Sequence, residues 1–155
     1  MIYTVTFNPA IDYVVHLPGS LELDAVNRTV QEEYLFGGKG INVSSVLRAL
    51  DCDNTALGFV AGPTGHWLET GLQAQGVKTD FIHLNQGVTR INVKIKATEE
   101  TEINGMGPQI AEADMEQLYA KLDKLGEGDA LVLAGSIPSC LPGDTYEKIM
   151  ARLEG

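Results

Sequence analysis

A glycine-rich stretch that contains one lysine, Gly37–Asn42, is the first candidate for chemistry in this sequence. Glycine tolerates positive φ angles and lets a ligand approach the backbone closely. The residues that follow predict a helix, and the first turn of a helix presents unpaired N–H groups at the positive end of its dipole. Such a loop suits an anion or an oxygen-rich ligand. The alternative is a tight turn between a strand and a helix with an exposed Lys39, and these residues alone leave both readings open.

The stretch does not match the common nucleotide-binding signatures. The spacing Gly-x-x-x-x-Gly-Lys-Ser/Thr of a phosphate-binding loop is absent, and so is the Gly-x-Gly-x-x-Gly pattern of dinucleotide-binding folds. The ligand of this loop is therefore not identified by a nucleotide motif.

Further polar residues follow predicted strands or lie in other polar segments. Asp12 comes after the first predicted strand and Ser136 after a late one, while Arg90 and Asn104 lie between them in the chain. Ligands of open α/β sheets bind beyond the carboxyl ends of the strands. Carboxylate and amide groups bind hydroxyls, and arginine and lysine hold phosphate, so this set predicts a polyhydroxylated, anionic small molecule. Two more residues at such strand ends are Asn8 and Gly135.

Alternating apolar strands and amphipathic helices predict an α/β fold, with helices on the faces of one sheet. Strands are predicted at 2–8, 55–62, 77–84 and 129–138, and helices at 41–51, 63–76, 111–125 and 142–155. The strand within 129–138 is apolar on both faces, which predicts a buried strand of a parallel sheet.

Three half-polar segments, about 11–16, 28–35 and 88–105, fit this sheet poorly and predict a separate small β-layer. The third is predicted to be a hairpin with one polar face. Asn92 and Lys94 lie on that polar face, either as ligands or as its solvent-exposed side.

Composition limits the class of protein. The 155 residues suffice for one domain with a sizeable core, and the net charge of −10 argues against a nucleic-acid partner. No apolar run is long enough for a membrane span, and the first residues lack the features of a signal peptide. Cys52 and Cys140 are isolated, so we expect a cytoplasmic protein without a disulfide framework or zinc site. Three histidines lack a partner at the spacing of a metal site or a catalytic triad: His16, His66 and His83.

Several motifs together resemble the amino-terminal half of the ribokinase-like (PfkB) sugar kinases. They run in order along essentially the whole chain: TFNPAIDYVVHL, GGKGINVSSVLRAL, ALGFVAG, TRINVKIK, ETEINGMGP and LAGSIPSCLPGDTYEKI. The resemblance implies an α/β sheet flanked by helices, with a small β-sheet lid that closes over the sugar and often forms a homodimer. Residues 1–155 would then be the amino-terminal part of one ribokinase-like domain.

The resemblance also implies roles for particular residues. Asp12 matches a ligand of the sugar hydroxyls, Arg90 matches a contact to the substrate phosphate, and Arg28 lies on the lid and could reach the neighbouring subunit's site. Asn104 and Ser136 match other active-site segments. The sugar-binding glycine loop is matched by Gly37, Gly38, Lys39 and Asn42.

The sequence departs from the family in its length. The family's Asn-x-x-Glu and Gly-Ala-Gly-Asp segments, which hold Mg²⁺ and phosphate and supply the catalytic base, are absent. We therefore expect a carboxy-terminal half to be missing, no catalytic residue or metal ligand in this chain, most contacts to ATP and Mg²⁺ elsewhere, and no turnover by the chain alone.

The motifs are most similar to the branch of the family that converts fructose 1-phosphate to fructose 1,6-bisphosphate with ATP. Tagatose-6-phosphate kinase activity is the alternative within the family. A non-catalytic module that binds a sugar phosphate or a partner protein is the alternative outside it.

Overall fold

The computed structural model describes residues 1–154. Its strands are Ile2–Thr6 (β1), Ala10–His16 (β2), Gln31–Gly37 (β3), Asn54–Ala61 (β4), Ile82–Leu84 (β5), Arg90–Lys96 (β6), Thr101–Asn104 (β7) and Ala130–Leu133 (β8). Its helices are Lys39–Ala49 (α1), Gly62–Ala74 (α2), Glu112–Leu122 (α3) and Thr145–Leu153 (α4).

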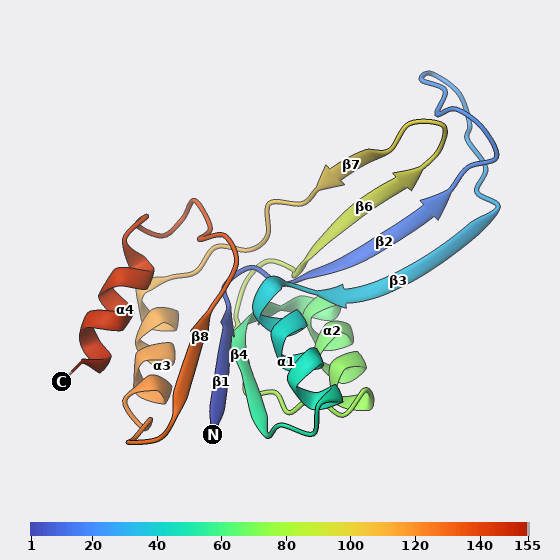
Figure 1. The fold of residues 1–155 in the computed structure, drawn as a ribbon. Helices are drawn as coiled ribbons and strands as arrows, with labels where there is room; N and C mark the ends of the chain where they lie inside the picture. The colour runs from blue at the N-terminus through green and yellow to red at the C-terminus, as the bar shows by residue number, and fades with distance from the viewer. Residues whose placement is uncertain (155) are drawn as a thin grey trace.

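The main sheet has the strand order β5-β4-β1-β8, and all of its strands are parallel. Helices α1 and α2 lie on one face, and α3 and α4 lie on the other (Figure 1). The sequence prediction of an α/β sheet with helices on both faces is confirmed. Such coverage is required because parallel strands with apolar side chains on both faces must be shielded from water on both sides.

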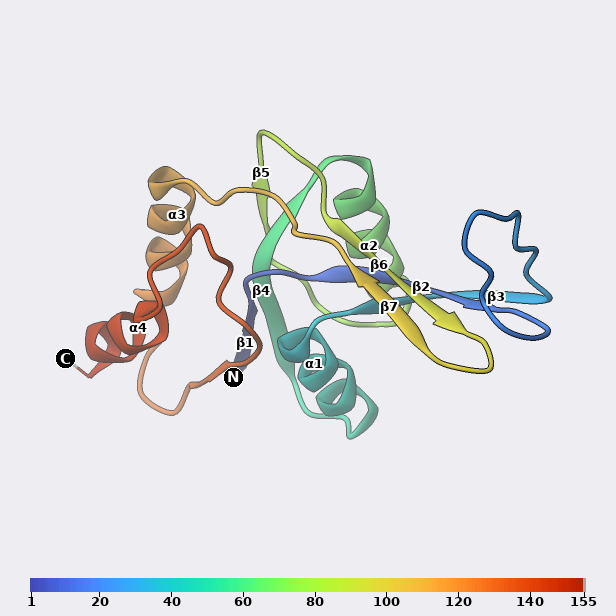
Figure 2. The same ribbon diagram turned by 90° about the horizontal axis from the view of Figure 1, so that it is seen from above.

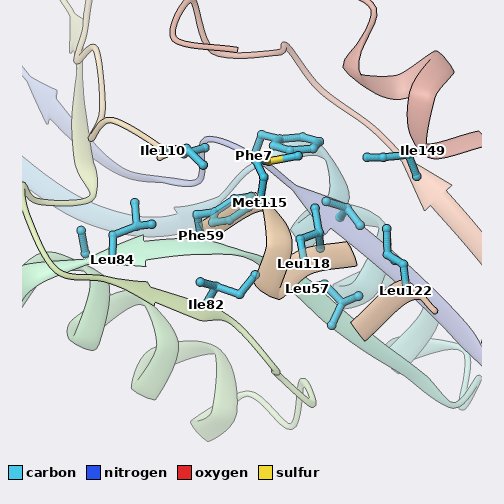
Figure 3. Packing of buried hydrophobic residues seen from close by; sticks show 12 residues of the cluster. Phe7, Leu57, Phe59, Ile82, Leu84, Ile110, Met115, Leu118, Leu122 and Ile149 are labelled. Atoms are coloured by element: carbon cyan, nitrogen blue, oxygen red, sulfur yellow. The ribbon is translucent and has the colours of Figure 1, made fainter. Parts of the chain in front are cut away.

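A cluster of apolar side chains fills the space between the main sheet and α3 (Figure 3). Phe7 and Phe59 stack in it with their ring centroids 5.7 Å apart. Leu118 and Leu122 of α3 are fully buried against the sheet, and Ile149 of α4 is also fully buried in this cluster. Leu118 and Leu122 are four residues apart, which places them on one face of α3.

A second cluster fills the opposite side of the sheet. Leu68 and Leu72 of α2 pack with Ile41 of α1 and Val60 of β4, and all four are buried. Ile11 of β2 joins this cluster, so the core continues from the main sheet to the base of the second sheet.

The second sheet has the order β3-β2-β6-β7 and extends away from the helices (Figures 1 and 2). Strand β2 pairs antiparallel with β3 and parallel with β6, and β6 pairs antiparallel with β7. Thus the hairpin predicted within 88–105 is confirmed as β6 and β7, and the predicted separate β-layer is present.

Three local predictions were wrong. Strand β8 is half-exposed rather than buried, because it is the last strand of its sheet and pairs only with β1 among the described residues. The strand predicted at 77–84 is reduced to β5 and one bridge from Thr79 to Ala56. Arg28 precedes β3 in an exposed loop, because the pairing of β3 with β2 begins only at Gln31.

Across the described residues, none of the helices combines the length and the apolar character needed to cross a membrane.

Candidate functional site

An open cleft of about 330 Å³ lies where the carboxyl ends of β1 and β8 meet the second sheet. Segments far apart in the chain form it: the β1–β2 connection, the start of α1, strands β6 and β7, and the segment after β8. Most of the predicted site residues line this cleft: Asp12, Gly38, Lys39, Asn42, Arg90, Asn104 and Ser136. The structure therefore brings these residues together at the sheet edge where the sequence places a ligand.

The glycine loop lies here because α1 begins directly against β1. The side-chain oxygen of Thr6 accepts a hydrogen bond of 2.9 Å from the backbone N–H of Ile41. A Cβ atom on Gly40 would lie 2.5 Å from that oxygen and 2.7 Å from the carbonyl oxygen of Val5. Gly38, the residue before the helix, has a φ of 137°, which favours glycine. Packing at Gly40 and the backbone conformation at Gly38 thus each favour glycine, in addition to any role with a ligand.

The opposite wall is the polar face of the second sheet. The Asp12 carboxylate accepts a hydrogen bond of 3.2 Å from the Asn92 amide. The Lys94 ammonium lies 3.9 Å from a carboxylate oxygen of Asp12 and 3.9 Å from one of Glu102. These side chains share one face because the register pairs Asp12 with Asn92 and Lys94 with Glu102. Asn92 and Lys94 both lie on the wall of the cleft.

The guanidinium of Arg90 is held by backbone carbonyls. It donates hydrogen bonds to the Asn8 oxygen at 3.1 and 3.3 Å and to the Gly105 oxygen at 3.3 Å. Asn8 in turn donates its side-chain amide to the Met106 carbonyl at 3.0 Å. These bonds fix the β1–β2 connection to the end of β7. Because a guanidinium has five N–H donors, two donors of Arg90 are left for a ligand in the cleft.

Two predicted residues do not line the cleft. A Cβ atom on Gly37 would lie 3.6 Å from the Asp12 carboxylate and 3.8 Å from the Asn42 amide, so Gly37 lies directly behind the cleft wall. Arg28 is exposed in the loop between β2 and β3, at the far end of the second sheet. The structure thus separates Arg28 from the cleft of its own chain.

Sequence reasoning missed two polar residues that line the cleft, Thr6 and Glu102. Thr6 lies within a strand whose other residues indicate a buried core strand. Its position in the cleft becomes visible only through its contact with α1. Glu102 follows Glu99 and Glu100 closely in the sequence, and a run of charges of this kind suggests solvent exposure. The alternation of β7 could have identified Glu102, since it shares a face with Asn104.

The side chains that line the cleft carry a small net positive charge. Lys39, Arg90 and Lys94 line it together with two carboxylates, Asp12 and Glu102. A local surplus of cations occurs here although the chain as a whole carries −10. This arrangement can bind hydroxyl groups through the carboxylate and amides, and an anionic group through the cations.

Among residues 1–154, no group of three or more His, Cys, Asp or Glu side chains is placed to hold a metal ion.

The sequence matches the pfkB family of carbohydrate kinases over residues 5–154. It is 49% identical over 149 residues to the 1-phosphofructokinase of Bacillus subtilis, covering 96% of this chain and 48% of that protein. It is 42% identical over 146 residues to the D-tagatose-1-phosphate kinase of Bacillus licheniformis, covering 94% of this chain and 47% of that protein.

The fold agrees with these relatives. A crystal structure from Staphylococcus aureus, provisionally assigned as a phosphofructokinase, superposes with a TM-score of 0.90 at 43% identity, covering 98% of this chain and 49% of that one. The chain spans about half the length of the curated relatives it matches. With a fold and a sequence match that both extend over nearly all of its residues, the chain belongs to the pfkB family of carbohydrate kinases.

Proposed function

We propose that the cleft is the sugar-phosphate site of a kinase that converts fructose 1-phosphate to fructose 1,6-bisphosphate with ATP. The observation that carries this proposal is the meeting of the polar face of the second sheet with the glycine loop in one cleft. This cleft brings hydroxyl-binding groups and cations together, and the chain belongs to a family of carbohydrate kinases.

The hydroxyl-binding groups lie on both walls. Asp12 accepts hydrogen bonds from sugar hydroxyls, and the amides of Asn42 and Asn104 can both donate and accept. Asp12 is held by Asn92, so its carboxylate is oriented before the sugar binds. Glycine at position 37 leaves the Asp12 carboxylate and the Asn42 amide uncrowded, because a Cβ atom there would lie 3.6 Å and 3.8 Å from them.

The cations suit the phosphate of the substrate. We assign this role to Arg90, Lys39 and Lys94. Lys94 is not in hydrogen-bond contact with either carboxylate at 3.9 Å, so an incoming phosphate can recruit its ammonium. We place Ser136 beside the substrate, because it lies at the end of β8 and borders the same cleft.

The reaction joins the free 6-hydroxyl of the sugar to the terminal phosphoryl group of ATP. Catalysis of such a transfer rests on positioning and on stabilisation of the phosphoryl charge. We assign to this chain the positioning of the sugar. We assign the contacts to ATP and Mg²⁺, and the base that takes the hydroxyl proton, to the part of the relatives that this chain does not span. The chain alone is then expected to bind the sugar without turnover.

We propose that the second sheet is the lid over this site, with strands at 10–16, 31–37, 90–96 and 101–104. We also propose that it forms a homodimer contact in the cytoplasm, with Arg28 reaching the neighbouring subunit. The exposed position of Arg28, far from its own cleft, supports this part of the proposal.

A thermal-shift titration without ATP tests the binding half of the proposal. At about 100 times its dissociation constant, a ligand stabilises the folded state by about 2.7 kcal/mol. We expect fructose 1-phosphate to raise the melting temperature. The Lys94→Ala variant should lose most of this shift, and the matched Lys96→Ala variant, further along the same strand, should keep it.

The relatives make tagatose phosphates the second candidates, and tagatose 1-phosphate and tagatose 6-phosphate belong in the same titration. A larger shift with either would assign the site to that sugar. If a cooperatively melting protein shows no shift with any of the three, the chain is not a preformed sugar-phosphate site. ATP-dependent phosphorylation after co-expression with the complementary half of a relative tests the kinase assignment. Turnover by this chain alone would contradict the assignment of the ATP contacts and the base to the part of the relatives that it does not span.

A further inference from the structure

The face of the second sheet that points away from the cleft is fastened to helix α2. Phe36 of β3 lies against Gly71 in the middle of that helix, so closely that any Cβ atom at position 71 would overlap its ring. A glycine within a helix costs about 1 kcal/mol relative to alanine. The close ring therefore explains why this helix contains a glycine at position 71.

Three further aromatic rings extend the contact of Phe36 along the sheet, which gives a row of four. Trp67 lies one turn before Gly71, and its ring is edge-on to Phe36, with centroids 5.7 Å apart at 84°. It is also edge-on to Tyr34, with centroids 5.0 Å apart at 66°. Tyr34 stacks on Tyr13 at 4.8 Å and 10°. These separations are those of attractive aromatic pairs.

The same strands carry the wall of the cleft on their other face. Tyr13 pairs with Tyr34, and the adjacent pair is Asp12 with Leu35. Because side chains alternate between the faces of a strand, these two pairs lie on opposite faces of the sheet. Asp12 also pairs with Asn92 of β6. The contact with Trp67 thus lies directly behind the Asp12 wall, on a helix of the main body.

We propose that Trp67 is a positioning residue: with Phe36 in the notch at Gly71, it sets the tilt of the second sheet and so the distance of the Asp12 wall from Ser136 in the segment after β8. No part of Trp67 lines the cleft. Its effect on a ligand is exerted through β3 and β2. The step from tilt to sugar binding rests on the proposed sugar-phosphate site, whereas the step from Trp67 to tilt does not.

A spin-label distance measurement tests the tilt without any ligand. Cys52 is exposed at the end of α1 and Glu99 is exposed at the tip of the β6–β7 hairpin. Labels at Cys52 and at Glu99→Cys, in a Cys140→Ser background, report the separation of the second sheet from the main body. We expect one narrow distance distribution in the parent, and a shifted or broadened one after Trp67→Leu or Gly71→Ala.

His66→Ala is the matched control, because His66 is exposed next to Trp67 on the same helix. It should leave the distance distribution unchanged. Trp67→Leu keeps an apolar side chain and Gly71→Ala keeps all four rings, so at least one variant should still unfold cooperatively. An unchanged distribution in folded Trp67→Leu and Gly71→Ala proteins would overturn the proposal.

Titration with fructose 1-phosphate supplies the second readout. A misplacement of about 1 Å can cost up to a hundredfold in a positioned complex, so we expect a loss of roughly tenfold or more in affinity for both variants. Altered distances with an unchanged affinity would refute the link to the ligand. If even the parent binds no sugar phosphate, the proposed function fails, while the distance measurement still decides the role of Trp67.

Discussion

The two sheets of this molecule have four strands each but differ in what their faces contact. The main sheet is parallel, carries helices on both faces and contains most of the buried apolar side chains. The second sheet has a polar face toward the cleft. Its apolar face meets the main body near its base, through Ile11 and through the contact of Phe36 with α2. The comparison shows that most of the core and most of the accessible polar side chains of the cleft lie on different sheets. One sheet holds the chain together, and the other presents side chains that remain accessible.

The sharpest test of this difference compares one buried leucine with one exposed isoleucine. Leu118 of α3 is 0% exposed, and Ile103 of β7 is 61% exposed. Leu118→Ala removes buried methyl groups and leaves a cavity, so we expect it to cost about 2–5 kcal/mol of unfolding free energy. Ile103→Ala should change that free energy by no more than about 0.5 kcal/mol. Urea unfolding measures both, and equal losses would contradict the comparison.

The packing of α1 against β1 can be disrupted at Gly40, at the start of the helix. Gly40→Ala places a methyl group against the backbone of β1, and we expect a cost of roughly 1–3 kcal/mol from overpacking. Gly143→Ala is the control, because nothing lies within 4 Å of its Cβ position. Thermal unfolding should rank Gly40→Ala well below the parent and Gly143→Ala close to it. A tolerated Gly40→Ala would show that α1 can move away from β1.

The second sheet still holds fixed local contacts, and Tyr13 reports one of them. A hydrogen bond to the Glu32 carboxylate raises the pKa of Tyr13 to about 12. Because the folded state keeps the phenol proton more tightly, the contribution to stability is complete below about pH 10 and is lost as the pH rises toward 12. A difference titration of phenolate absorbance between the parent and Tyr13→Phe should show this late ionisation. Glu32→Ala should bring it to lower pH, and an unshifted titration would mean that the pair is open in solution.

The smallest effects come from two surface carboxylates, one on each part of the molecule. Arg152 holds Asp123 through two bonds of 2.7 Å and lowers the pKa of its carboxyl group. Lys96 lowers the pKa of Glu100 within one hairpin. A lowered pKa stabilises the fold above the unfolded value and less so as the pH falls.

Only the first pair joins two helices, α3 and α4. Asp123→Asn should therefore lower the urea midpoint slightly at neutral pH, with a difference that shrinks as the pH falls below about 3.9. Glu100→Gln should leave the global midpoint unchanged. A midpoint that responds more to Glu100→Gln would reverse the comparison between the two regions.

Strands of both sheets were predictable from the sequence, and two of the three errors fell on β5 and β8, the outer strands of the main sheet. Apolar runs and helical spacing identify β1, β4, α1, α2 and α3 to within a few residues, because burial imposes those patterns. Burial of β8 could not be predicted from its own residues. An apolar strand has the same sequence pattern at the edge of a sheet as in its middle, and the number of its partners is set by tertiary structure.

In the candidate site, residue types were predictable and their partners were not. Alternation along residues 90–96 put Asn92 and Lys94 on one face, and the register then brought Asp12 to them. Nothing local indicates that Arg90 donates to the carbonyl of Asn8, 82 positions away in the sequence. The strand containing Arg28 was predicted too early because β propensity does not show where pairing begins.

The aromatic contact behind the cleft has a practical consequence. Trp67 is the only tryptophan of the chain, and it lies at the contact between the main body and the second sheet, against Tyr34 and Phe36. Its emission spectrum therefore comes from one place in the molecule, and that place changes whenever the two parts move relative to each other. Without any added dye, the fluorescence of this protein therefore reports how the second sheet lies against helix α2.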